Sequence, residues 1–369
     1  MARTLSRVDQ EFLTQAVELG RKGWGRVHPN PMVGCVLVRD GTVIGEGWHE
    51  ELGGPHAEVN ALQQAGDRSR GATAYVSLEP CNHFGRTPPC SSALLDAGIS
   101  EVVFGAADPG TESSGGGEAL RSAGVNVIGP VLPPGGGSRE NPAFFFNQEH
   151  AATYVALKLA QTLDGRIAEA PGRRTAITGP EAGLETHRLR AGYDGIMVGS
   201  ETALVDDPLL TVRGDVPFRK QPTRIILDSQ ARVVPGTRLF QDLPEAPLVI
   251  FSGEDAPGES VSRLERAGAT VHRVPRGPSG LSLQAVLGVC WDTGIRSILC
   301  EGGGRVASEL IQGGFARRLY LFVAPFVLGE SGVPAFSRTG PRESWDTWEP
   351  AGAPEFFGKD FLLTFDRTD

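Results

Sequence analysis

The chain has no long apolar run and no excess of basic residues, and both absences narrow its class. No run approaches the ~20 apolar residues of a membrane-spanning helix. The first residues, MARTLSRVDQ, lack the apolar core of a signal peptide. The formal net charge is −9 at pH 7. Because broad nucleic-acid binding needs a basic surface, we expect no nucleic-acid partner. Because no apolar run is long enough to span a bilayer, we expect no membrane partner either.

Cysteine is also scarce, with five in 369 residues. Cys35, Cys290 and Cys300 stand in apolar runs, which is typical of buried, reduced thiols rather than of a disulfide framework. We therefore expect a cytoplasmic protein. The length favours two domains over one, and 40% hydrophobic with 21% charged residues is the balance of a globular chain.

The other two cysteines belong to a stretch that carries metal-ligand chemistry. His56-Ala57-Glu58 is followed by Pro80-Cys81 and then, beyond a polar loop, by Cys90. One imidazole and two thiolates are ligands that Zn²⁺ favours, and three protein ligands leave the fourth position open for water. Glu58 is spaced to shuttle protons for that water. This is the pattern of a zinc-dependent hydrolytic deaminase acting on a pyrimidine-like ring.

A simpler reading of these residues is a structural metal site or a pair of core cysteines. The ligands, the glutamate and the proline occur together and in the deaminase order, which favours the catalytic reading. The run PCNHFGRTPPC, with NPMVGCVLV upstream, closely resembles the deaminase half of the bifunctional riboflavin-biosynthesis deaminase/reductase family. The resemblance implies that Asn30 lines the pyrimidine pocket. It also favours His83 and Arg86 as contacts of the ribose phosphate, although both are equally typical of a solvated loop.

Local patterns around these motifs predict alternating helices and strands. A capping box at Ser6 begins a helix to about Gly20, Asp40-Gly41 joins two strands of a hairpin, and a strand at 72–78 leads to Cys81. Further helices are expected at 56–65, 91–97 and 118–123, and strands at 101–105 and 125–131. The alternation predicts an α/β three-layer sandwich, as in the cytidine-deaminase-like fold.

A Pro- and Gly-rich segment divides the chain. We expect the zinc-dependent pyrimidine deaminase domain at 1–131, a linker at 132–146 and a second domain at 147–369. Strands are predicted at 154–159, 195–199, 223–227, 247–251, 296–300, 319–323 and 361–365. Helices between them, at 181–191, 260–267, 283–290 and 306–312, predict a mainly parallel sheet.

The second domain carries a glycine turn, Glu301-Gly302-Gly303-Gly304-Arg305, between a strand and a helix. Alone, such a turn is weak support for phosphate binding. The runs KLAQTLDGRIA (158–168) and GSETALVDDPLLTVR (199–213) strengthen it, because together the three resemble the reductase half of the same family. That resemblance implies a dihydrofolate-reductase-like α/β domain that uses NADPH.

The resemblance also assigns residues of the reductase site. The positions implied for NADPH are Ala160, Ala176, Thr202, Asp206, Gly303, Gly304, Arg305, Val306, Ala307, Ser308 and Glu309. Those implied for the substrate are Arg174, Arg190, Leu210, Arg213 and Glu301. A phosphorylated sugar independently favours arginine, whose planar fork binds phosphate at two points, although a surface salt bridge is the ordinary role of such a residue.

Four positions depart from the family pattern, and one of them is Gly183, because the usual Ala-Arg pair is Ala182-Gly183 here. Arg174 stands for a serine and Ala176 for a tryptophan expected against the cofactor, while Gly110 replaces an asparagine of the deaminase half. Loss of an aromatic from a cofactor site removes about 0.5–1.5 kcal/mol of ring-pair stabilisation besides buried area. This keeps an alternative open, in which the chain is a deaminase whose second domain is a binding or scaffolding module.

The resemblance predicts two successive reactions on a phosphoribosylated pyrimidine. Zinc, one ion per chain, supports hydrolytic deamination of 2,5-diamino-6-hydroxy-4-(5-phosphoribosylamino)pyrimidine. NADPH then reduces the ribosyl group of 5-amino-6-(5-phosphoribosylamino)uracil to ribityl. Two rivals are a nucleic-acid-editing deaminase, disfavoured by the acidic charge, and a non-catalytic zinc protein, disfavoured by Glu58. Homo-oligomerisation through the reductase domain is a further expectation from the family.

Overall fold

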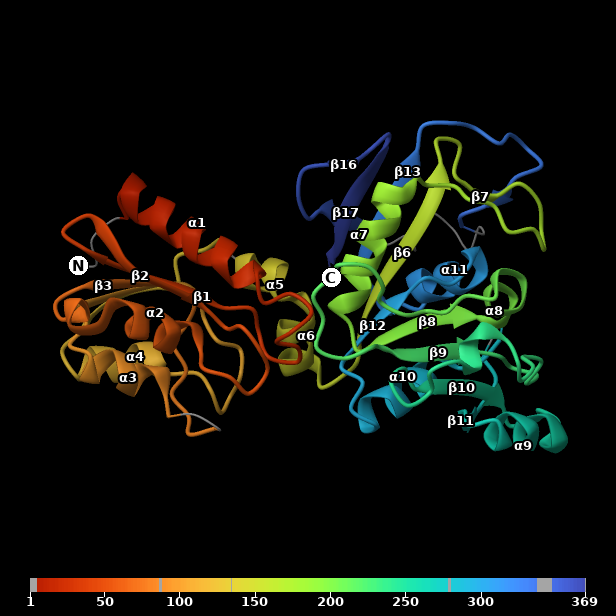
Figure 1. The fold of residues 1–369 in the computed structure, drawn as a ribbon, viewed down its shortest axis with the longest axis horizontal. Helices are drawn as coiled ribbons and strands as arrows, with labels where there is room; N and C mark the ends of the chain where they lie inside the picture. Colours follow the sequence, from red (N-terminus) through yellow and green to blue (C-terminus); the bar gives the residue numbers. More distant parts are fainter. Residues whose placement is uncertain (1–4, 86–87, 134, 278–279, 337–346, 369) are drawn as a thin grey trace. The chain divides into compact units, whose positions relative to one another are not determined.

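A computed structural model describes residues 5–85, 88–133, 135–277, 280–336 and 347–368. The chain divides into two compact units, Met1–Ala151 and Ala152–Asp369, and each is described by itself (Figure 1). Among the described residues, no helix has both the length and the apolar character needed to cross a membrane.

The first unit is built on a five-stranded sheet in the order β2-β1-β3-β4-β5. β1 and β2 form the predicted hairpin, in which Asp40 and Gly41 both adopt positive φ, and β3, β4 and β5 run parallel to one another. The strands are β1 (Gly34–Arg39), β2 (Thr42–Trp48), β3 (Thr73–Leu78), β4 (Glu101–Ala106) and β5 (Asn126–Ile128).

Helices cover both faces of this sheet, because its strands are apolar on both sides. One face packs against α1 through a cluster that includes Ala16, Leu19 and Val36. The other face packs against α2, α3 and α4 through Ala61, Leu94 and Leu120, all fully buried. The predicted three-layer sandwich is therefore confirmed. The helices are α1 (Arg7–Arg21), α2 (Ala57–Ala65), α3 (Cys90–Asp96) and α4 (Gly116–Ser122), with a 3₁₀ turn at η1 (Gly66–Ser69).

The start of α1 confirms the predicted capping box. The Asp9 amide donates to Ser6 Oγ at 3.2 Å, and the Ser6 amide donates to Asp9 Oδ2 at 2.7 Å. These bonds satisfy amides that have no partner within the helix. Asp9 Oδ1 also accepts from the buried Tyr75 hydroxyl at 2.6 Å, so the cap ties α1 to β3.

The segment expected to be a linker, 132–146, is largely helical. It carries α5 (Gly136–Glu140) and the beginning of α6 (Pro142–His150), and it falls within the first unit. Asn141 accepts from the Met32 amide at 2.7 Å and donates to the Met32 carbonyl at 3.1 Å, which attaches these helices to the loop before β1. Proline at the first position of a helix is favourable, so Pro142 starts α6 rather than extending a linker.

The second unit contains one ten-stranded sheet in the order β11-β10-β9-β8-β12-β6-β13-β17-β15, with β16 paired to β17. Strands β11 to β13 in this order are parallel, and β17 pairs antiparallel with β13. The strands are β6 (Tyr154–Thr162), β8 (Gly195–Gly199), β9 (Thr223–Leu227), β10 (Leu248–Gly253), β11 (Thr270–Val274), β12 (Ser297–Cys300), β13 (Ala316–Ala324), β15 (Thr347–Pro350), β16 (Glu355–Phe357) and β17 (Asp360–Thr368).

The parallel part of this sheet forms the largest core of the unit. Buried side chains of β6, β8, β9 and β12 pack against two helices, through residues such as Val286 and Leu310. The helices of the unit are α7 (Pro180–Ala191), α8 (Ser200–Asp206), α9 (Gly258–Arg266), α10 (Leu283–Asp292) and α11 (Gly304–Gln312), with η2 (Arg238–Phe240). A small two-stranded sheet pairs β7 (Arg166–Ala168) with β14 (Val333–Pro334).

Candidate active sites

His56, Cys81 and Cys90 converge in the first unit. Their ligand atoms all lie within 4.8 Å of one another. His56 Nδ1 is 3.2 Å from Cys90 Sγ and 3.5 Å from Cys81 Sγ. One imidazole and two thiolates at this spacing fit a tetrahedral Zn²⁺ with one open position. The spacing in the sequence predicted these ligands, and the structure brings all three together.

Local structure explains how residues so far apart meet. His56 is the N-cap residue of α2, Cys81 follows β3, and Cys90 is the first residue of α3. The Cys90 amide donates to Cys81 Sγ at 3.4 Å. Cys81 does not itself begin a helix, but its sulfur faces the start of α3, where the helix dipole favours a thiolate.

The turn that carries Cys81 is held by Glu79. Its carboxylate accepts from the Gly117 amide at 3.0 Å and from the Asp108 amide at 3.3 Å. Gly116 must be glycine, since a Cβ there would overlap the Pro80 carbonyl oxygen. The backbone of α4 thus approaches the Pro80-Cys81 turn closely and fixes the cysteine in place.

Electrostatics at the site favour one thiolate. A hydrogen bond from Cys90 and another from His56 lower the pKa of the Cys81 thiol against the opposing effect of burial. The hydrogen bond to Cys81, followed by burial, raises the pKa of Cys90. Two buried thiols side by side oppose the ionisation of both, and a divalent cation bound between them would favour the thiolate form of each.

Glu58 lies against the three ligand residues. It is 3% exposed, in the first turn of α2, and burial followed by the charge of Cys81 raises its pKa. A buried carboxyl with a raised pKa takes up and releases protons more readily near neutral pH than an exposed one does. The geometry therefore suits a proton carrier beside an open metal position.

Sequence reasoning missed His49, which joins two parts of this site. Its Nε2 is 3.3 Å from Asn30 Nδ2, and its Nδ1 is 3.0 Å from the Pro55 carbonyl. Its ring also lies edge-on to that of His56, with centroids 5.3 Å apart. His49 is 3% exposed and burial lowers its pKa. No spacing rule singles out such a histidine, because its role depends on the packing of β2 against α2.

The loop between the two cysteines carries the other predicted contacts of the first unit. His83 is half-buried, and its Nδ1 has no hydrogen-bond partner within the part of the chain that the structure describes. Arg86 lies outside the described residues. Asn82 accepts from Ser91 Oγ at 2.8 Å, which ties the start of the loop to α3.

Gly110, where the family pattern has asparagine, lies in a compact turn after β4. Its amide donates to Asp108 Oδ1 at 2.8 Å, and the Ser114 amide donates to the Gly110 carbonyl at 3.0 Å. A Cβ at Gly110 would press against Ser113 Oγ. The glycine thus belongs to a turn folded on Asp108 and Ser113.

The second unit holds a cleft of about 1080 Å³. It lies at the carboxyl ends of β6, β8, β9 and β12, where ligands bind in open α/β sheets. Most residues predicted for the reductase site line it: Ala160, Arg174, Ala176, Arg190, Thr202, Asp206, Leu210, Arg213, Glu301, Gly303, Gly304, Arg305, Val306 and Glu309.

Two predicted cofactor residues do not line the cleft. Ala307 is fully buried in the core, and Ser308 is 5% exposed and donates from Oγ to the Gly304 carbonyl at 2.6 Å. Both lie on the face of α11 that packs inward. The sequence motif covers consecutive residues and does not show which of them face the cleft. Side chains of consecutive helical residues point in different directions, so of residues 305–309 only Arg305, Val306 and Glu309 line the cleft.

The glycine turn is shaped for a close ligand. α11 begins at Gly304, and a Cβ on that residue would lie 2.8 Å from the carbonyl oxygens of Pro334 and Ala335. Gly303 is open towards Thr202, whose Oγ1 would be 3.6 Å from such a Cβ. The start of α11 and Thr202 thus line the cleft together, and a helix N-terminus beside a hydroxyl group suits a phosphate.

Arg190 and Glu301 are joined by two hydrogen bonds at the inner end of the cleft. Arg190 Nε donates to Glu301 Oε1 at 2.6 Å and Nη2 donates to Oε2 at 2.9 Å. Burial by itself would raise the pKa of Glu301, but the charge and hydrogen bonds of Arg190 lower it overall. Arg190 was expected to offer its fork to phosphate, and the structure instead commits that fork to Glu301.

Lys158 lies beside this pair on β6. Burial, its largest influence, lowers its pKa, while the charge of Glu301 opposes that shift. Its Nζ lies over the Phe322 ring, 5.4 Å from the centroid. The inner end of the cleft therefore combines a cationic amine, a carboxylate and a guanidinium, which suits a polyhydroxylated ligand.

Two residues depart from the family pattern on the outer wall of the cleft. Arg174 and Ala176 are both exposed there. Burial raises the pKa of Asp206, and the charge of Arg174 opposes that rise, so Arg174 faces the end of α8. The methyl group of Ala176 leaves that wall without an aromatic surface.

Further polar side chains on the wall were not predicted: Ser200, Glu201, Ser229, Gln230, Arg232 and Arg238. Four of these follow β9, the strand next to β8. The signal that could have found them is the strand order, since a neighbouring parallel strand ends at the same edge of the sheet. Strand order cannot be read from local sequence patterns.

Comparison with known proteins agrees with this pair of sites. Residues 6–106 match the family described as the cytidine and deoxycytidylate deaminase zinc-binding region, and residues 153–355 match the RibD C-terminal domain. The riboflavin biosynthesis protein RibD of Aquifex aeolicus is 39% identical over 88% of this chain and 89% of its own. The Escherichia coli RibD protein is 38% identical over 87% of this chain and 89% of its own.

The chain belongs to the RibD family. Solved RibD structures have the same fold along nearly the whole chain. Acinetobacter baumannii RibD superposes with a TM-score of 0.84 at 32% identity, over 98% of this chain and 99% of its own. A diaminohydroxyphosphoribosylaminopyrimidine deaminase/5-amino-6-(5-phosphoribosylamino)uracil reductase from Thermotoga maritima superposes with a TM-score of 0.82 at 33% identity, over 98% and 99%.

Membership of the RibD family fixes the activities of the two units. The chain is a bifunctional deaminase and reductase of riboflavin biosynthesis, with a zinc-dependent hydrolase site in the first unit and an NADPH-dependent oxidoreductase site in the second. The His-Cys-Cys cluster fits zinc, and the glycine turn with its cationic cleft fits a phosphorylated dinucleotide. The deaminase-like sandwich and the reductase-type second domain are both confirmed.

Proposed function

We propose that His56, Cys81 and Cys90 are the zinc ligands of the deaminase site and that Glu58 is its proton carrier. When bound, zinc lowers the pKa of water so that a nucleophile is available at neutral pH. Water oxygen adds to the ring carbon that carries the amino group, and the carbon–nitrogen bond then breaks. Glu58 moves the proton taken from water to the ring nitrogen and on to the departing ammonia.

Substrate recognition in the same unit is proposed for Asn30, His83 and Arg86. Asn30 presents an amide in contact with His49, which supports hydrogen bonding to a pyrimidine edge. His83 has a ring nitrogen with no partner in the described part of the chain, which supports a contact with the anionic ribose phosphate. Arg86 is proposed for the same phosphate from its place in the motif alone.

In the reductase unit, we assign the outer cleft to NADPH and the inner cleft to the deaminated substrate. When bound, NADPH would supply a hydride to the ribosyl carbon, and the ring oxygen released from that carbon would take up a proton. The glycine turn, Ala160, Thr202 and Asp206 would orient the cofactor. Glu301 would accept hydrogen bonds from ribose hydroxyls, while Arg213 would bind the phosphate and Leu210 would pack beside it.

The extent of the domains and the compartment are also proposals. The deaminase is proposed to occupy 1–131 with an attached helical segment, and the reductase to begin near 147. The boundary between compact units, at Ala151 and Ala152, supports this division. All five cysteines are free thiols and all are buried, which supports a reducing compartment such as the cytoplasm.

The observation that carries the proposal is the convergence of His56, Cys81 and Cys90 beside the buried Glu58. A coupled assay with the diaminopyrimidine substrate tests it. Ammonia release should proceed without NADPH, and NADPH oxidation should require prior deamination. If ammonia is released but the deaminated product causes no NADPH oxidation and calorimetry finds no NADPH binding, the second unit is a scaffold and the reductase assignments are wrong.

A further inference from the structure

The loop Leu210–Arg213 on the cleft wall has a backbone that needs external support. Leu210 adopts φ of 50°, in the left-handed region that branched and bulky side chains rarely occupy, and its side chain is 1% exposed. Such a conformation persists only where the surroundings over-determine it. Besides Arg190, the contacts that hold this loop come from two residues to which no role has yet been assigned.

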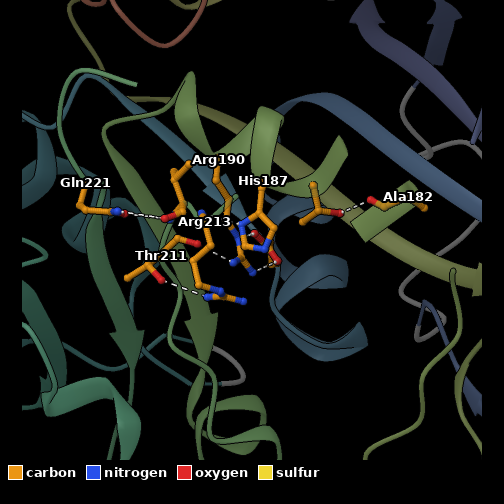
Figure 2. Close-up of polar contacts among 9 residues, drawn as sticks. Ala182, His187, Arg190, Thr211, Arg213 and Gln221 are labelled. Atoms are coloured by element: carbon orange, nitrogen blue, oxygen red, sulfur yellow. Dashed lines mark hydrogen bonds and ion pairs between the residues drawn. The ribbon is translucent and has the colours of Figure 1, made fainter. Parts of the chain in front are cut away.

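Gln221, two residues before the start of β9, binds the middle of the loop at two points. The Val212 amide donates to Gln221 Oε1 at 2.8 Å, and Gln221 Nε2 donates to the Val212 carbonyl at 3.0 Å. The side-chain amide thus satisfies both backbone groups of one residue, as a neighbouring strand would do. Figure 2 shows Gln221 at the edge of the cluster around Arg190 and Arg213.

His187, on α7, holds the end of the loop. The Arg213 amide donates to His187 Nδ1 at 3.2 Å, so that nitrogen must be unprotonated. Burial, followed by the charges of Arg190 and Arg213, lowers the pKa of His187 to about 4, against the opposing charge of Glu301. The imidazole therefore remains an acceptor at neutral pH, although it faces two guanidinium groups (Figure 2).

Arg190 completes the set of contacts. Its Nη1 donates to the Thr211 carbonyl at 3.0 Å while its other nitrogens bind Glu301. Arg213 Nη1 donates to Thr211 Oγ1 at 3.0 Å and, within the described ranges, the Arg213 side chain forms no salt bridge. The cleft wall therefore offers Arg213 as a cation with unused donors.

We propose that His187 and Gln221 are positioning residues that hold the loop Leu210–Arg213 in the one conformation that presents the Arg213 guanidinium to the phosphate of the reductase substrate. Repulsion between Arg190 and Arg213 would otherwise favour an outward position of Arg213, where both cations are better solvated. The inference rests on the proposed role of Arg213. Beyond that role, the inference explains how Arg213 is held in position for the phosphate. Two residues outside the lining of the cleft, His187 and Gln221, would hold it there.

The test compares reductase kinetics on pre-deaminated phosphorylated substrate. Gln221→Met keeps the length of the side chain and removes both hydrogen bonds, and His187→Leu removes the acceptor. Each should raise the KM for the substrate about tenfold, the effect of a misplaced charge-assisted contact. We expect kcat within about twofold and an unchanged KM for NADPH. Calorimetry with ribose 5-phosphate should show a parallel loss of affinity, which does not depend on turnover.

Three controls separate positioning from general damage. His187→Asn supplies an oxygen near the position of Nδ1 and should recover most of the affinity lost in His187→Leu. Gln312→Met changes an exposed glutamine at the end of α11 and should change nothing. In an Arg213→Gln background, Gln221→Met should have no further effect on KM, because coupled residues are non-additive.

Different results would contradict the positioning role of His187 and Gln221 and the phosphate-binding role of Arg213 on which it rests. If Arg213→Gln raises the KM but folded Gln221→Met and His187→Leu leave it unchanged, the positioning role is wrong and the role of Arg213 stands. If Arg213→Gln leaves the KM unchanged, the phosphate assignment fails and the inference fails with it. If Gln221→Met does not fold, the pair His187→Leu and His187→Asn decides, and equal KM values for these two contradict the inference.

Discussion

Arg190 and Glu301 are 111 residues apart in the chain, yet their side chains meet through two hydrogen bonds of 2.6 and 2.9 Å. Each side chain is 11% exposed. α7 brings the arginine and the end of β12 brings the carboxylate, so the pair connects a helix to the sheet beneath the cleft. Removing one partner of such a buried pair strongly destabilises the folded state, because water cannot solvate the charge that remains.

Glu301→Gln should therefore destabilise the reductase unit by about 3–5 kcal/mol, the usual cost of removing one partner of a buried pair. Chemical denaturation of the full chain, followed by tryptophan fluorescence and circular dichroism, measures the loss. Glu309→Gln is the matched control, because Glu309 pairs with the exposed Arg305 at 3.5 Å and such pairs contribute about 0–1 kcal/mol. An equal loss of unfolding free energy in the two variants would show that the buried Arg190–Glu301 pair stabilises the unit no more than an exposed pair does.

The same pair predicts a dependence of stability on pH. The pKa of Glu301 is lower in the folded protein than its ordinary value, so the folded state binds a proton less readily than the unfolded chain does. The stabilisation is therefore fully present above the ordinary glutamate pKa and is lost as the pH falls through the folded pKa. Wild-type stability should decline through this acid range, and Glu301→Gln should remove that part of the decline. An unchanged slope in the variant would contradict this origin.

The order of residue types along the chain predicted that His56, Cys81 and Cys90 cluster, although up to 34 residues separate them. Most helices and strands followed from patterns among neighbouring residues. Ser6 and Asp9 cap a helix within one turn, and Asp40-Gly41 closes a hairpin without help from the rest of the chain. His49 could not be found in this way, since its contacts with Asn30 and the Pro55 carbonyl follow from packing. The linker prediction missed two helices, because its glycines and prolines act there at helix starts rather than as breakers.

Tertiary contacts also decided which arginine is available to a ligand. Arg190 and Arg213 looked equivalent as phosphate-binding side chains in the sequence. The structure buries the first against Glu301 and leaves the second on the cleft wall without a carboxylate partner in the described part of the chain. Such a difference depends on strand order and on the loop conformation at Leu210, neither of which has a local signature.

Replacement of a zinc ligand should remove the metal without unfolding the unit. Cys81→Ser should lower zinc affinity at least tenfold, since loss even of supporting contacts around a metal costs 10–100-fold. Metal analysis of the purified full chain should find about one zinc in wild type and little in the variant. Cys290→Ala, a buried cysteine of the other unit, is the control and should keep its zinc. Full zinc retention in Cys81→Ser would exclude this residue as a ligand.

The missing aromatic at Ala176 should affect NADPH affinity rather than hydride transfer. The residue is exposed on the cleft wall, while the glycine turn and Thr202 remain in place. Ala176→Trp should tighten NADPH binding by about 0.5–1.5 kcal/mol, the value of a favourable aromatic contact. Calorimetry measures the affinity directly. Deamination should be unaffected, and a change in the ammonia-release rate would show that the substitution acts through something other than the cofactor wall.

The central claim is that one chain carries two separate sites, and Glu58→Gln tests it most directly. The variant keeps the size of the side chain but cannot carry the proton, so ammonia release should fall about 10²–10⁴-fold while zinc content stays near one per chain. NADPH oxidation on pre-deaminated substrate, measured with the same preparation, should equal that of wild type. Near-normal ammonia release, or a parallel loss of NADPH oxidation, would contradict the account.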